Sequence, residues 1–83
     1  MNFMKKKENE LSLLWQLGKR IAFLRKQRGL TQLALSIESG LALSFISDLE
    51  RGKRNPSIET LWKIAKALDV SLEELLRGIV PIE

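Results

Sequence analysis

Apolar residues recur at steps of three and four along most of the chain, which is the spacing of one face of an α-helix. The first stripe comprises Leu11, Leu14, Gly18, Ile21 and Leu24. It predicts a helix over residues 11–28, because Gly29 follows as a stop signal. Residues 1–10 are polar and basic without such a period, so we expect a flexible arm there.

Apolar spacing, capping residues and glycines predict four more helices, near residues 31–40, 41–52, 57–69 and 71–78. Thr31, Ser57 and Ser71 are hydroxyl residues that can cap three of them by accepting a hydrogen bond from a backbone N–H. No strand-like alternation occurs along the sequence. The pattern therefore predicts an all-α domain of five helices over residues 11–78, followed by an apolar tail at 79–83.

The length of 83 residues fits a single domain, and so short a chain gains stability from pairing with a second copy. No apolar run approaches the roughly 18 residues that a membrane span needs. The charged residues 1–10 do not resemble a secretory signal either. We therefore expect a cytoplasmic protein that works as a homodimer. We expect no membrane partner.

The chain contains no cysteine and no histidine, which removes thiolate and imidazole chemistry and most zinc sites. Its acidic residues are scattered or stand where helix caps favour them, so no catalytic cluster is visible. We expect no enzyme activity, no metal, no cofactor and no small-molecule ligand.

Lysine and arginine number 14 against 10 acidic residues, and this formal net charge of +4 favours an anionic partner. The excess is gathered in clusters at residues 5–7, 19–28 and 51–54. For the first two clusters, a charged helix face in contact with solvent is as good an explanation as an anionic partner.

Residues 31–52 read TQLALSIESGLALSFISDLERG, in which two short helices meet at Gly40. This segment resembles the Cro/repressor-like (XRE-type) helix-turn-helix family, which includes phage repressors and restriction-modification controller proteins. The resemblance runs without gaps over residues 17–76 and rests on Leu24-Arg25, Leu30-Thr31-Gln32, Gly40, Ile46-Ser47, Glu50-Arg51-Gly52, Asn55-Pro56-Ser57, Leu61 and Ile64-Ala65. It implies a five-helix, lambda-repressor-like DNA-binding domain whose helix after the corner lies in the major groove.

The resemblance assigns base reading to the exposed face of that helix, at Leu43, Ser44, Phe45, Ser47 and Asp48. Leu43 departs from the family, which usually carries a long polar residue there. Leu43 would touch a thymine methyl group or merely pack, and Phe45 would act as a partly buried wedge or an apolar base contact. Ser44 would donate or accept a hydrogen bond at a base edge, and Asp48 would accept a hydrogen bond from a cytosine amine.

Phosphate contacts are expected from Thr31, Gln32, Arg51, Lys53, Arg54 and Asn55. Gln32 stands at the amino end of a helix, where its amide and the free backbone N–H groups can meet a phosphate oxygen. The basic residues follow the reading helix and would neutralise phosphates beside the groove. The alternatives are a plain surface glutamine and a solvated loop.

Three further features of the sequence concern the stability and assembly of the domain and not direct contact with DNA. Arg25 and Glu50 match a partly buried ion pair that in this family fixes the seating of the reading helix. Ala42 replaces the usual hydroxyl cap, at a cost of roughly 0.5–2 kcal/mol in helix stability. An apolar set suits either a subunit contact or packing against the arm: Leu33, Ile37, Trp62 and residues 79–82.

These features predict a bacterial or phage transcriptional regulator, a repressor or operon autoregulator, that binds a palindromic operator in double-stranded DNA. The alternative is a protein–protein interaction module, or an antitoxin-like partner-binding protein, that retains the fold. Leu33, Ile37, Leu43 and Phe45 motivate it, because an apolar stripe suits a protein groove better than a phosphate backbone. A steep salt dependence of duplex binding would favour DNA as the partner.

Overall fold

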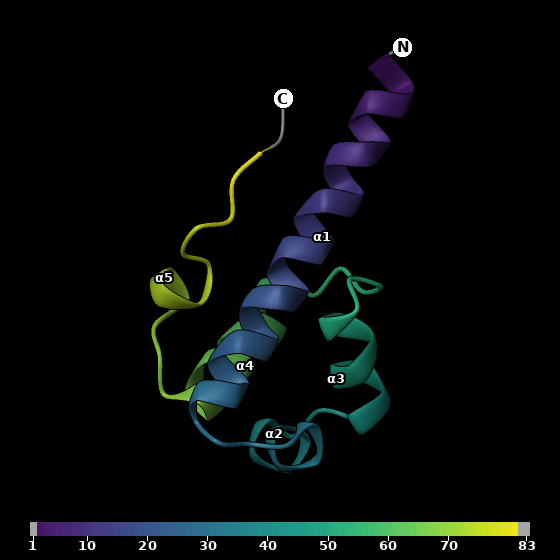
Figure 1. Ribbon diagram of the computed structural model, residues 1–83. Helices are drawn as coiled ribbons and strands as arrows, with labels where there is room; N and C mark the ends of the chain where they lie inside the picture. The colour runs from purple at the N-terminus through teal and green to yellow at the C-terminus, as the bar shows by residue number, and fades with distance from the viewer. Residues whose placement is uncertain (1, 82–83) are drawn as a thin grey trace.

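The computed structural model describes residues 2–81, with side chains from residue 13 onward, and its secondary structure is entirely helical over that range. Figure 1 shows the helices α1 (Asn2–Gln27), α2 (Gln32–Ser39), α3 (Leu43–Glu50), α4 (Ile58–Leu68) and α5 (Leu72–Leu75). The predicted all-α class and the predicted order of five helices are therefore confirmed. Among these described helices, none is long and apolar enough to cross a membrane.

One apolar core joins all five helices. Its fully buried large side chains are Ile21, Leu35, Ile46, Leu49, Ile64, Leu68 and Leu75. Burying a leucine or isoleucine side chain contributes about 1.5–3 kcal/mol, so contributions from every helix are needed to hold so small a domain together. Helix α1 lies against both α3 and α5, and α4 lies against α2 and α5.

The helix starts form where the hydroxyl residues predicted them. Thr31 Oγ1 accepts from the Ala34 N–H at 3.0 Å and caps α2. Ser57 Oγ accepts from the Thr60 N–H at 3.1 Å and caps α4. Ser71 caps α5 in the same manner, with 2.9 Å to the Glu74 nitrogen. Each cap satisfies a backbone donor that the first helical turn leaves unpaired.

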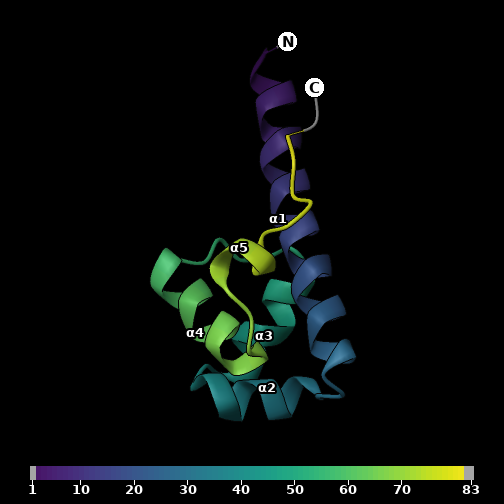
Figure 2. The same cartoon turned by 90° about the vertical axis from the view of Figure 1, so that its left-hand side faces the viewer.

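The prediction that α1 begins at Leu11 is wrong, because the helix begins at Asn2. Residues 2–10 therefore continue α1, the flexibility of the arm at residues 1–10 stays a prediction, and Met1 lies outside the described residues. The physical reason is that residues 2–17 contain no glycine or proline, and lysine, glutamate, methionine and leucine all favour helix. Figures 1 and 2 show this amino-terminal part projecting beyond the bundle.

The C-terminal segment is docked on the bundle, whereas the sequence predicted a fifth helix up to Gly78 and a separate tail. Helix α5 ends at Leu75, and Ile79 packs against the core. The Gln16 side chain exchanges two hydrogen bonds with the Val80 backbone, at 2.9 Å and 3.1 Å. Figure 2 shows the segment running beside α1, and residues 82–83 of the predicted tail lie outside the described range.

Candidate nucleic-acid interface

Helices α2 and α3 meet at a tight corner. Gly40 has φ 76°, a left-handed conformation that glycine adopts without strain, and its N–H bonds to the Ser36 carbonyl oxygen at 2.9 Å. The Ser36 hydroxyl donates to the Leu41 carbonyl oxygen, and the Leu41 N–H reaches Ser39 Oγ at 3.4 Å. Sequence reasoning predicted the corner at Gly40 but not the hydrogen bonds of the two serines, whose position in the last turn before a glycine was the available signal.

Helix α3 has one buried side and one open side. Ile46, Leu49 and Glu50 face the interior. Leu43 and Ser44 are exposed. The remaining residues predicted to read bases are half-buried: Phe45, Ser47 and Asp48. The amino end of α3 is thus its most open part, and the Ala42 side chain makes no capping hydrogen bond there, as predicted.

Arg25 and Glu50 join α1 to the end of α3. Arg25 Nε lies 2.7 Å from Glu50 Oε2 and Nη2 lies 3.0 Å from Oε1, so the predicted pair is a two-bond contact between buried side chains. Arg25 Nη1 also donates to the Leu30 carbonyl oxygen at 2.8 Å. Gln32 Nε2 donates to Glu50 Oε1 at 2.9 Å. One carboxylate therefore links α1, α2 and α3.

Two glycines bring α1 close to the carboxyl end of α3. A Cβ atom at Gly18 would lie 2.5 Å from the Leu49 carbonyl oxygen and 2.6 Å from that of Glu50. Gly52 has φ 76°, and a Cβ atom there would lie 3.0 Å from the Trp15 Cα atom. The sequence placed Gly18 in an apolar stripe and Gly52 at a helix end, but it did not predict that both positions need a bare backbone.

Asp48 lies between two arginines that follow it along the chain. Arg51 Nη2 is 2.6 Å from its Oδ1, and Arg54 Nε is 3.6 Å from its Oδ2. The hydrogen bond from Arg51 lowers the pKa of the Asp48 carboxyl below its ordinary value. The Arg54 guanidinium also lies over the Phe45 ring, 5.1 Å from its centroid. Binding a cytosine amine would require Asp48 to share or exchange these partners.

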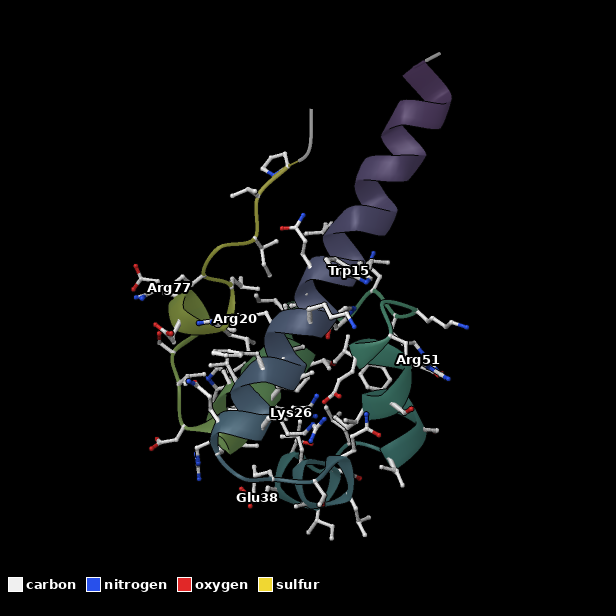
Figure 3. All side chains as sticks on the ribbon, viewed as in Figure 1. Trp15, Arg20, Lys26, Glu38, Arg51 and Arg77 are labelled. Atoms are coloured by element: carbon white, nitrogen blue, oxygen red, sulfur yellow. The ribbon has the colours of Figure 1, made fainter. Side chains whose placement is uncertain are left out.

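The residues predicted to bind phosphate lie at two places. Thr31 and Gln32 stand at the start of α2, where the Thr31 hydroxyl caps the helix and the Gln32 amide already donates to Glu50. The second place is the turn after α3, whose exposed polar side chains are Arg51, Lys53, Arg54 and Asn55. Figure 3 shows Arg51 at the α3 side of the molecule, and Arg77 at the opposite side.

A short helix, a glycine corner and a second helix with one open face define a helix-turn-helix protein. The model of the helix-turn-helix family matches residues 21–75. The chain belongs to this family.

Relatives and solved structures agree with that assignment. The regulator y4dJ of Sinorhizobium fredii, described as an uncharacterized HTH-type transcriptional regulator, is 46% identical over 71% of this chain and 77% of its own length. The restriction-modification controller protein C.AhdI from Aeromonas hydrophila superposes with a TM-score of 0.73 at 42% identity, over 75% of this chain and 94% of the controller.

A third similar structure is that of SinR, the master regulator for biofilm formation, in complex with DNA. It has a TM-score of 0.69 at 41% identity, over 72% of this chain and 97% of that chain. The chain spans only 31–55% of the length of seven other curated relatives that it matches.

Proposed function

We propose that this protein is a sequence-specific transcriptional regulator that inserts α3 into the major groove of double-stranded DNA. The observation that carries the proposal is the exposed amino-terminal face of α3, with Leu43 and Ser44, followed by a turn that presents Arg51, Lys53 and Arg54 to solvent. The similarity to SinR, which was solved with DNA, supports the same conclusion. An operator of bacterial or phage DNA implies that the protein works in the cytoplasm.

In this proposal the two groups of residues have different tasks. Leu43, Ser44, Phe45, Ser47 and Asp48 read base edges, and their contacts decide which sequence is bound. The second group fixes the register on the backbone and neutralises phosphates: Thr31, Gln32, Arg51, Lys53, Arg54 and Asn55. Since the Gln32 amide donates to Glu50, the backbone N–H groups at the start of α2 are the better phosphate donors there.

The protein acts as a homodimer on a palindromic operator, with half-sites about 34–36 Å apart on one face of the duplex. Leu33, Ile37 and Trp62 support a subunit contact, because each exposes at least half of its surface in the isolated chain. The alternative, packing of these side chains against residues 1–10, stays open, because the side chains of those residues lie outside the described part of the chain.

Selection of bound sequences from a random duplex library tests the proposal. We expect enrichment of a palindrome whose halves lie about one helical turn apart. Ser44→Ala should change the preferred base at one position of each half without abolishing binding, because Ser44 is exposed and makes a base contact in the proposal. A library that shows no enrichment over several rounds would overturn the proposal.

A second candidate function is recognition of a protein partner, as in an antitoxin. Leu33 and Ile37 favour it, because they stand one turn apart on α2 and are 55% and 72% exposed. Duplex binding that is weak and insensitive to salt would favour this candidate, because phosphate contacts make DNA binding strongly salt-dependent.

A further inference from the structure

Phe45, Asp48, Arg51 and Arg54 form a connected ladder at the outer edge of α3, which we call the α3 ladder. Their spacing of three residues places them in succession along one side of the helix and of the turn that follows. Asp48 pairs with Arg51 at 2.6 Å and with Arg54 at 3.6 Å, and Arg54 lies over Phe45 at 5.1 Å. Asp48, the only acidic side chain on this edge of the described helix, thus forms ion pairs with both arginines of the ladder.

The pairs in the ladder are accessible to a competing anion. The side chains of Arg51 and Arg54 are 60% and 49% exposed, and that of Asp48 is 30% exposed. Surface ion pairs of this kind add little stability, so a phosphate oxygen can replace the carboxylate as a partner of either arginine. That exchange leaves the Asp48 carboxylate unpaired and facing a polyanion, which is unfavourable.

We propose that Asp48 is a specificity-determining residue that weakens binding to random DNA by competing with phosphates for Arg51 and Arg54. A duplex that presents a base amine to Asp48, from cytosine N4 or adenine N6, replaces the lost arginine partners and removes the penalty. A duplex without that amine bears the full repulsion. This inference rests on the proposed function, since it concerns the same interface and assigns it a means of rejecting non-specific DNA.

The shape of the turn does not depend on the carboxylate. The Asp48 backbone carbonyl oxygen accepts from the Lys53 N–H at 2.9 Å and from the Arg51 N–H at 3.2 Å. Phe45 packs against the core and provides a fixed surface under Arg54. Asp48→Asn keeps the size of the side chain and removes its charge, so the fold and the turn remain while the competition is lost.

The experiment compares wild type and Asp48→Asn on a random duplex and on a library-selected duplex, over a range of salt concentrations. We expect the substitution to increase affinity for random DNA and to reduce the ratio of selected to random affinity roughly tenfold, the typical value of one base contact. The salt slope on random DNA should steepen by about 0.9 for each phosphate that a released arginine gains.

Asp69→Asn is the matched control, because Asp69 is exposed and lies at the end of α4, and asparagine tolerates its left-handed φ of 59°. Asp69→Asn removes the same charge. It should change the ratio of selected to random affinity and the salt slope less than Asp48→Asn does. Asp48→Ala serves as a second variant, and Asp48→Asn combined with Arg51→Gln should lose most of the gain on random DNA.

The outcomes separate this inference from the proposed function. Wild type that binds no duplex overturns both. Wild type that binds a selected site, with Asp48→Asn no different from Asp69→Asn, overturns the role of Asp48 alone. If Asp48→Asn and Asp48→Ala both lose affinity for selected and random DNA equally, the role of Asp48 in specificity is also overturned. That result would mean that Asp48 only supports the structure.

Discussion

The buried contact between Arg25 and Glu50 has the largest expected effect among single residues. Removing Arg25 leaves the buried Glu50 carboxylate with the hydrogen bond from Gln32, and the Leu30 carbonyl oxygen loses the hydrogen bond from Arg25. We expect Arg25→Ala to lower the free energy of unfolding by about 3–5 kcal/mol and to weaken DNA binding. Chemical denaturation measures the first effect and a duplex titration the second.

The exposed neighbour Lys26 provides the control, since Lys26→Ala should change stability by less than about 0.5 kcal/mol. A double-mutant cycle with Arg25→Met and Glu50→Gln isolates the pair. Additive effects in that cycle would contradict the assigned coupling between the two residues.

At the scale of elements, α3 lacks a capping side chain. Ala42 is exposed and has φ −63° and ψ 145°, an extended conformation that threonine and valine both adopt. These two residues have nearly the same shape, but only threonine supplies a capping oxygen. We expect Ala42→Thr to be more stable than Ala42→Val by about 1 kcal/mol in thermal or chemical unfolding. Equal stability of the two variants would show that the start of α3 gains nothing from a cap.

Gly18 gives a second prediction at this scale, because the sign of the stability change on substitution by alanine tests how closely α1 approaches α3. Glycine to alanine in an ordinary helix interior stabilises by roughly 0.5–1 kcal/mol. Here the new Cβ atom would lie 2.5 Å from a backbone oxygen of α3, which cannot rotate away. We therefore expect Gly18→Ala to destabilise by about 1–3 kcal/mol in chemical denaturation. Lys19→Ala, at an exposed neighbour on α1, should be near neutral, and a more stable Gly18→Ala would refute the close approach.

The starts of α2, α4 and α5 were predictable because their signals are local. Thr31, Ser57 and Ser71 bond to N–H groups three residues later, so the sequence alone places those caps. The start of α1 was not predictable from its apolar stripe, since helix propensity extends the helix past the last apolar contact.

Side-chain partners were predictable only through the family. Arg25 and Glu50 were paired by resemblance, whereas the contacts of Asp48 with Arg51 and of Gln32 with Glu50 depend on rotamers and on how two helices approach. Neither spacing nor composition carries that information. The roles of these residues in DNA binding stay predictions, and two of them, Asp48 and Arg51, are hydrogen-bonded to each other in the isolated chain.

For the whole molecule, the placement of charge decides how binding responds to salt. Arg51 and Arg77 are both exposed, each pairs with an acidic residue three positions before it, and they lie at opposite sides of the structure (Figure 3). Only Arg51 borders the proposed interface. Counterion release makes log affinity fall by about 0.9 against log salt for each phosphate neutralised.

Arg51→Ala should therefore reduce the salt slope by about 0.9, while Arg77→Ala should leave it unchanged. Titrating each variant into a duplex at several salt concentrations measures the slope. Because the two arginines match in charge, exposure and local pairing, a difference between them reports position on the molecule and not the loss of one positive charge. Equal slopes for both variants would mean that the duplex does not bind at the side where α3 presents its basic turn.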